Sequence, residues 1–251
     1  MSERDEFYIG YLDRAPGGVG GFVRMRVVLI AIIGVLIAAV LASSQNPFTV
    51  AFFDFGSPRT YEGVVRTSPH PVLEVDRPGA ADGSVSRYML VGFGKAGAEG
   101  DVGELDGQRI RLEATPIYRD AQTMLEIVPE SVEALGAGPG PAAAALSLGE
   151  FTLEGEIVDS KCHLGVMKPG ETKPHRACAT LCIRGGIPPI LVLRSGDLPV
   201  AHLMLVGADG EAINEHVLDY VAEPVRIRGE VMRMGDLWML RAAPTAIRRL
   251  P

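Results

Sequence analysis

Tyr88-Met89-Leu90-Val91-Gly92 matches Leu203-Met204-Leu205-Val206-Gly207 at an offset of 115 residues. Both segments alternate in the manner of a half-buried β-strand. The same offset aligns two further pairs of segments, residues 111–114 (RLEA) with 226–229 (RIRG), and Met124-Leu125 with Met239-Leu240. One offset held over separate strand-like blocks predicts an internal repeat, although short β-rich segments also match by chance.

Upstream of these blocks the offset changes. Residues 60–65 (TYEGVV) match residues 152–157 (TLEGEI) at an offset of only 92, which is 23 residues less. We therefore expect an insertion in the second copy. The chain has three cysteines, Cys162, Cys178 and Cys182, and all of them fall in this stretch. Because the cysteines are present in one copy of the repeat only, we expect the functional site to lie in the insertion of the second copy.

The composition favours many short strands over a helical bundle. The 251 residues include 30 Gly and 18 Pro, and aromatic residues make up only 6%. We predict a mainly β protein, with an N-terminal transmembrane helix followed by two tandem small β-barrels of the OB type. A small β-sandwich fits the strand pattern nearly as well. The predicted segments are a cytosolic start at 1–26, a transmembrane helix at 27–47, a first barrel at 56–135, a linker at 136–149, and a second barrel at 150–251 with a Cys/His insertion at 159–186.

The charge excludes one class of partner. The formal net charge is −7, and no run of basic residues is present. Binding to nucleic acid depends on clustered Lys and Arg, so we expect no nucleic-acid partner. The sequence also identifies no small-molecule substrate, because it contains no serine-nucleophile motif, phosphate loop, Cys-x-x-Cys pair or haem-attachment motif.

Residues 27–42 carry no charge and no strongly polar side chain. Such a helix has no face suited to water, and a few following residues would complete a membrane crossing. A cleaved signal peptide is the alternative, but the acidic leader argues for a retained anchor. Arg14, Arg24 and Arg26 precede the span, and Arg59 is the first basic residue after it. The positive-inside tendency predicts a single-pass membrane protein with a cytoplasmic N-terminus and exported barrels.

The insertion predicts a metal site. Pro174 suits the first turn of a helix, and Gly185-Gly186 suits its end. In such a helix His175, Cys178 and Cys182 lie at i, i+3 and i+7 on one face. Cys162 lies upstream on a loop that can fold back. Together they supply a Cys₃His donor set, for which zinc is the default ion. Copper and an iron–sulfur cluster remain open.

Two other interpretations of the cysteines stay open. A disulfide between Cys178 and Cys182 is disfavoured within a helix, but Cys162 could pair with either and leave one odd thiol. The protein would then be a disulfide-stapled structural or interaction protein. Alternatively, it is a thiol-dependent enzyme with Cys178 or Cys182 as nucleophile and His175 as base.

Two stretches carry a resemblance. The insertion runs GEIVDSKC at 155–162, then GVMKPG at 165–170 and HRACATLCIRGGIPP at 175–189, and the chain opens with DEFYIGY at 5–11. These stretches resemble a signature of uncharacterised membrane-anchored bacterial proteins. The resemblance implies a membrane location and the cysteine motif, but no activity, and its pattern does not require a histidine at His163. This resemblance and the apolar residues 7–12 together lead us to expect that the protein docks on a respiratory or envelope membrane complex.

Other polar and sulfur side chains are interpreted as structural. We expect Asp159 and Lys161, which closely precede Cys162, to form a surface pair. The remaining residues considered are His70, His202 and His216 as isolated histidines, Met167, Met232, Met234 and Met239 as gap-filling core, and Trp238 as core or rim packing.

Overall fold

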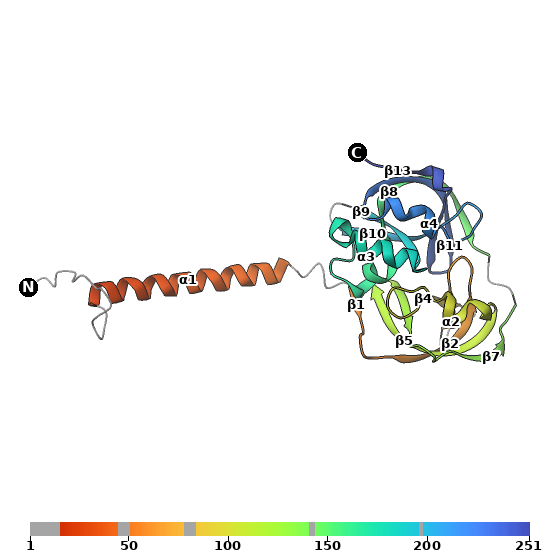
Figure 1. Ribbon diagram of the computed structural model, residues 1–251, viewed down its shortest axis with the longest axis horizontal. Helices are drawn as coiled ribbons and strands as arrows, with labels where there is room; N and C mark the ends of the chain where they lie inside the picture. The colour runs from red at the N-terminus through yellow and green to blue at the C-terminus, as the bar shows by residue number, and fades with distance from the viewer. Residues whose placement is uncertain (1–15, 45–50, 78–83, 141–143, 196–197) are drawn as a thin grey trace, which may run out of the picture. The chain divides into compact units, whose positions relative to one another are not determined.

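In the N-terminal unit of the chain, the residues that the structure describes form one helix (Figure 1). The structure is a computed structural model that describes residues 16–44, 51–77, 84–140, 144–195 and 198–251. The chain divides into two units, Met1–Thr49 and Val50–Pro251. In the first unit, α1 (Gly17–Ser44) is long and apolar enough to cross a membrane, and no part of its most apolar window is buried within the protein. The predicted docking segment 7–12 lies outside the described residues.

The second unit begins with a closed five-stranded barrel. Its strands are ordered β5-β2-β3-β4-β6, and the barrel closes because β6 also pairs with β5. The strands are β2 (Arg59–Arg66), β3 (Val72–Asp76), β4 (Val85–Val91), β5 (Gln108–Arg119) and β6 (Gln122–Ile127). β4 and β6 are parallel, and the other neighbours are antiparallel. Two short helices, α2 (Glu99–Val102) and η2 (Gly103–Leu105), follow β4, and the edge strands β1 (Ala51–Phe53) and β7 (Glu133–Ala137) pair with β5.

A second barrel with the same strand order follows. Its order is β11-β8-β9-β10-β12, and β12 closes it by pairing with β11. The strands are β8 (Leu146–Asp159), β9 (Pro189–Ser195), β10 (Leu198–Val206), β11 (Pro224–Met234) and β12 (Leu237–Arg241). The shorter elements are α4 (Asn214–Val217), η4 (Leu218–Tyr220), η5 (Pro244–Ala246) and β13 (Ile247–Arg249), which pairs with β11. The mainly β fold with two closed, OB-like barrels is therefore confirmed, and a sandwich is not formed.

The strand registers of the two barrels correspond residue by residue. Met89 pairs with Met124 in the first barrel, and Met204 pairs with Met239 in the second. The same correspondence holds for an antiparallel pair, because Glu62 lies opposite Arg111 and Glu154 lies opposite Arg226. Each of these Glu–Arg pairs also forms an ion pair. These registers have the sequence offsets of 115 and 92.

The barrels differ in the connection after their first strand. In the first barrel, residues 67–71 link β2 to β3 directly. In the second barrel, residues 160–188 link β8 to β9 and contain η3 (Cys162–Val166) and α3 (Thr172–Arg184). The helix α3 ends where the sequence predicts, and it begins two residues before Pro174. All three cysteines lie on η3 and α3.

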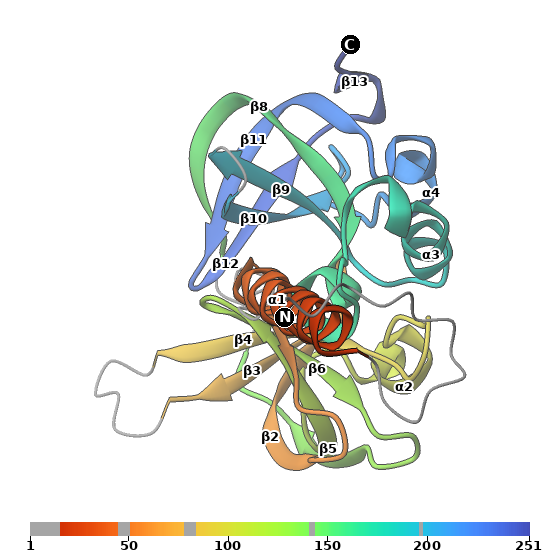
Figure 2. The same ribbon diagram turned by 90° about the vertical axis from the view of Figure 1, so that its left-hand side faces the viewer.

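The three largest apolar clusters among the described residues hold the second unit together. Each barrel has its own interior core, and a third cluster contains buried residues of both barrels. Strand alternation divides these clusters: Leu90 faces the first interior, while Met89 and Val91 belong to the shared cluster. Cys162 and Cys182 are also members of the shared cluster. Figure 2 shows the two barrels, with α3 beside α4 at one side of the second.

Strand pairing extends into the stretch predicted to be a linker. β7 and β8 occupy parts of residues 136–149. In that linker, Ala137 pairs with Gln108, and Leu146 pairs with Arg233. The backbone hydrogen bonds to a neighbouring strand outweigh the weak strand preference of a Gly- and Ala-rich segment.

Candidate functional site

Local signals place two of the cysteines on one end of α3. Pro174 lies in its first turn, and the Gly185 N–H donates to the Leu181 carbonyl at its end. Gly186 follows with a φ of 95°, a conformation that favours glycine and ends the helix. Cys182 is buried, while Cys178, one turn earlier, is half-buried.

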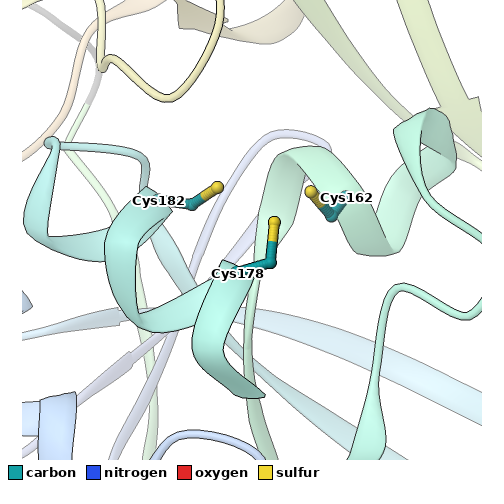
Figure 3. Close-up of side chains that lie close together, drawn as sticks. All are labelled: Cys162, Cys178 and Cys182. Atoms are coloured by element: carbon teal, nitrogen blue, oxygen red, sulfur yellow. The ribbon is translucent and has the colours of Figure 1, made fainter. Parts of the chain in front are cut away.

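The three sulfurs converge. The Sγ atoms of Cys162, Cys178 and Cys182 lie within 4.8 Å of one another, and all three cysteines are free. In Figure 3 the side chain of Cys162, on η3, points toward the same space as those of Cys178 and Cys182 on α3. The predicted fold-back of the loop therefore brings these three residues together.

His175 lies in an adjacent group. Its Nε2 is 3.0 Å from Asp159 Oδ2, and the other carboxylate oxygen accepts a hydrogen bond of 2.8 Å from the Cys162 N–H. Ligand atoms of Asp159, Cys162 and His175 lie within 4.8 Å of one another. Cys162 is thus shared between a three-sulfur group and an Asp–His group, and His175 belongs to the second group only.

Lys95 contacts the sulfurs from the first barrel. Its Nζ lies 2.8 Å from Cys178 Sγ and 3.9 Å from Cys182 Sγ. The hydrogen bond with Cys178 raises the pKa of Lys95, so its ammonium is charged at neutral pH. A hydrogen bond with Cys162 lowers the pKa of Cys182, the charge of Lys95 acts in the same direction, and burial opposes both. The hydrogen bond with Cys182 and burial raise the pKa of Cys162. These contacts therefore favour the thiolate at Cys182, with Cys162 as the donor of the shared hydrogen bond.

Lys161 is buried, which corrects the expected surface pair. Lys161 and Asp159 are 2% and 0% exposed, and they do not pair with each other. Lys161 Nζ donates to the carbonyl oxygens of Gly92, at 2.9 Å, and Gly94, at 2.7 Å. It also forms an ion pair with Glu126 of the first barrel. The expectation failed because the partners of Lys161 are distant in sequence, whereas Asp159 turns toward His175 and the Cys162 N–H.

The same first-barrel loop docks on the end of α3. The Gly97 N–H donates to the Gly185 carbonyl at 2.8 Å. A β-carbon at Gly185 would lie 2.0 Å from the Lys95 carbonyl oxygen, and one at Gly97 would lie 2.4 Å from the Gly186 carbonyl oxygen. Only glycine permits this approach of two backbones. The Lys95 loop and the cysteine helix are therefore held in direct contact.

Replacing Gly185 with alanine is expected to lower the free energy of unfolding by about 1–3 kcal/mol, because the new methyl group overlaps the Lys95 carbonyl. The matched control is Gly100→Ala on α2, where a β-carbon meets nothing within 4 Å. We expect the control to be neutral or slightly stabilising. Urea unfolding followed by Trp238 fluorescence measures both. Equal stability of the two variants would contradict the close docking of the loop.

His202 is not isolated, which corrects a second expectation. It is 7% exposed, and its ring centroid lies 5.0 Å from that of His163, which is fully buried. His163 Nδ1 lies 3.2 Å from a carboxylate oxygen of Glu171. Burial lowers the pKa of His163, lowers that of His202 to about 3 and lowers that of the buried His70 to about 4. These three histidines are neutral at physiological pH.

The other side chains set aside from the site divide between core and surface. Met239 is buried in the cluster shared by the barrels, and Met232 and Met234 pack against it. Met167 is 43% exposed, so its assignment to the core is wrong. Trp238 is 38% exposed, with the Arg233 guanidinium 5.4 Å from its ring centroid. His216 is exposed.

Sequence reasoning missed Lys95, Glu126 and the burial of Lys161. Lys95 lies in a glycine-rich connection that reads as an ordinary loop, and no spacing ties it to the cysteines. The only signal in the sequence was that this loop follows β4, at the place where an equivalent loop follows β10. Without knowledge of how the barrels pack, that signal does not indicate which side chain of the loop reaches the cysteines.

The donor set fits a thiophilic metal ion. Thiolates and imidazoles are the ligands of Zn²⁺ and Cu⁺, and three convergent sulfurs supply most of a coordination shell. The same sulfurs could carry out thiol–disulfide exchange, since Cys178 is half-buried beside an ammonium group.

A scan against protein-family models and a search of curated proteins found no match for this chain.

Proposed function

We propose that this chain is a membrane-anchored protein that binds one thiophilic metal ion through Cys162, Cys178 and Cys182. The observation that carries the proposal is the convergence of three free sulfurs, within 4.8 Å of one another, from two separate elements. Metal ligation explains why Cys162 and Cys182 are buried together and why the sulfurs of Cys178 and Cys182 lie beside the Lys95 ammonium group. His175, the fourth residue of the predicted donor set, is the proposed fourth ligand or the group that orients Cys162 through Asp159.

Elemental analysis tests the proposal directly. The full-length chain, purified in detergent under reducing conditions, is expected to hold about one Zn²⁺ or Cu⁺ ion per chain and no disulfide. Cys162→Ser, Cys178→Ser and Cys182→Ser should each lose stoichiometric metal, because each removes one of three thiolates. A wild-type chain that takes up neither ion after incubation with Zn²⁺ or Cu⁺ would refute metal binding.

The role of His175 is separated by a matched pair of variants. His175→Asn should abolish stoichiometric binding if the imidazole is a ligand, and should weaken binding about 10–100-fold if it only orients the site. His216→Asn changes an exposed histidine and should bind as wild type does.

The proposed location rests on α1 and on the distribution of arginines. We propose a retained anchor in the bacterial inner membrane, with both barrels in the periplasm. An alkaline phosphatase fused after Pro251 should then be active, and an inactive fusion would contradict this orientation. Docking on a respiratory or envelope complex is the proposed context. Co-purification unchanged by deletion of the first twelve residues would remove that segment as the docking element.

A second candidate function is thiol–disulfide exchange. The position of Cys178 favours it, since this sulfur is only half-buried, and can be reached by a partner, beside the Lys95 ammonium group. The Cys178 thiol would attack a partner's disulfide and release one partner thiol, and a second cysteine of the group would then attack Cys178 and release the other. Two electrons and two protons would then pass to the partner. A chain free of metal with one fast-reacting thiol would support this alternative over the first.

A further inference from the structure

Lys95 approaches the cysteines from a different barrel. It follows β4 of the first barrel, whereas the cysteines lie between β8 and β9 of the second. Its Nζ is 2.8 Å from Cys178 Sγ and 3.9 Å from Cys182 Sγ. The contact therefore exists only because the barrels pack together.

The loop that carries Lys95 is held on both sides of this residue. Lys161 Nζ donates to the Gly92 and Gly94 carbonyls before Lys95. After it, the Gly97 N–H donates to the Gly185 carbonyl at the end of α3. The long lysine side chain is exposed, but the position of its backbone is fixed relative to the cysteine helix.

The equivalent loop of the second barrel lacks this side chain. The Gly92 N–H donates to the Ala96 carbonyl, and the Gly207 N–H donates to the Glu211 carbonyl. The isolated bridges Val91–Gly97 and Val206–Ala212 also correspond. At the offset of 115 the counterpart of Lys95 is Gly210, with a φ of 88°. The loop geometry is shared, and of these two positions only the one facing the sulfurs carries a cation.

Charge balance gives this cation a role. Three thiolates around a divalent ion leave one negative charge in excess, in a group whose sulfurs are partly or fully buried. Uncompensated charge in such surroundings is costly. One ammonium group neutralises the divalent ion with its three thiolates, whereas with a monovalent ion one negative charge would remain beside the Asp159 carboxylate.

We propose that Lys95 is a positioning residue of the metal site, which supplies its counter-charge from the first barrel and favours a divalent ion such as Zn²⁺. This inference rests on the proposed metal-binding function. It makes the site a joint property of both barrels, although all of its sulfurs belong to one.

The test measures the Zn²⁺ dissociation constant of the full-length chain by competition with a chelating dye. Lys95→Met removes the charge and keeps the length of the side chain. We expect it to raise the dissociation constant about tenfold, at the lower end of effects for groups outside the ligand set, because Lys95 is solvent-exposed. Lys95→Arg, which keeps the charge, should restore most of the affinity. Lys173→Met, on the exposed side of α3, is the matched control and should bind as wild type does.

Ionic strength separates charge from structure. Salt screens the exposed ammonium, so the difference between wild type and Lys95→Met should shrink at high ionic strength. A purely structural role would leave that difference unchanged and would give no rescue by arginine. Equal affinity of wild type and Lys95→Met would overturn the inference while leaving the metal site intact. A wild-type chain that binds no Zn²⁺ would instead refute a zinc site itself.

Discussion

Replacing Lys161 with methionine is expected to lower the free energy of unfolding of the Val50–Pro251 unit by about 3–5 kcal/mol, the typical cost of removing one partner of a buried ion pair. Lys161 is 2% exposed, and its partner Glu126 is mostly buried. The methionine would leave the Glu126 carboxylate without its cation, and it would leave the Gly92 and Gly94 carbonyls without their donor. Urea unfolding of the full-length chain in detergent, followed by the single tryptophan Trp238, measures the change.

The control for this experiment is a second substitution. Lys161→Met combined with Glu126→Leu replaces the whole pair with apolar groups, and it should recover a large part of the lost stability. Lys168→Met, at an exposed position, should change the free energy of unfolding by less than about 0.5 kcal/mol. If Lys161→Met is as stable as Lys168→Met, the buried pair does not hold the barrels in the arrangement described.

Mild acid is expected to destabilise the metal-free protein by about 2 kcal/mol at pH 5 for each of His70 and His202. Burial lowers the pKa of His202 to about 3 and that of His70 to about 4, and it also lowers the pKa of His163. In the unfolded chain these histidines take up a proton near pH 6.5. Below that pH the unfolded state holds more protons than the folded state, so stability falls as the pH decreases from about 6.5 toward these lowered values.

Single substitutions show which histidines cause the pH dependence of the unfolding free energy. His202→Gln and His70→Gln should each remove about 2 kcal/mol from the difference in unfolding free energy between pH 7 and pH 5, whatever their effect at pH 7. His216→Gln, at an exposed position, should leave the difference as it is. Glu171, whose pKa is lowered to about 2 mainly by His163, acts in the same direction but only below about pH 4.5. An unfolding free energy that is constant from pH 7 to pH 5 would contradict neutral burial of these side chains.

Local sequence patterns predicted the barrels well, because strand pairing follows alternation that is visible in the chain. The segments around Met89 and Met204 form β4 and β10, and their registers carry the predicted offset. Pro174 and Gly185 likewise mark the cysteine helix, since capping signals are local. These elements could be predicted because their causes lie within a few residues of one another.

The surroundings of the cysteines could not be predicted in the same way. Lys161 was expected at the surface because its neighbours in sequence are polar, but its partners come from another barrel. Lys95 and Glu126 acquire their contacts through the packing of Met89, Met124, Met204 and Met239 between the barrels. That packing involves the outward faces of the strands. The alternation of apolar and polar residues in the sequence shows that such a face is apolar, but it does not show which element packs against it.

The split origin of the cysteine group also constrains how the gene can vary. A recombinant that exchanges only the first barrel for a distant relative's would keep every sulfur, yet it could lose Lys95 and the glycine contact at Gly97 in one step. The two barrels must therefore be inherited together for the contacts between Lys95, Gly97 and the cysteine helix to be kept.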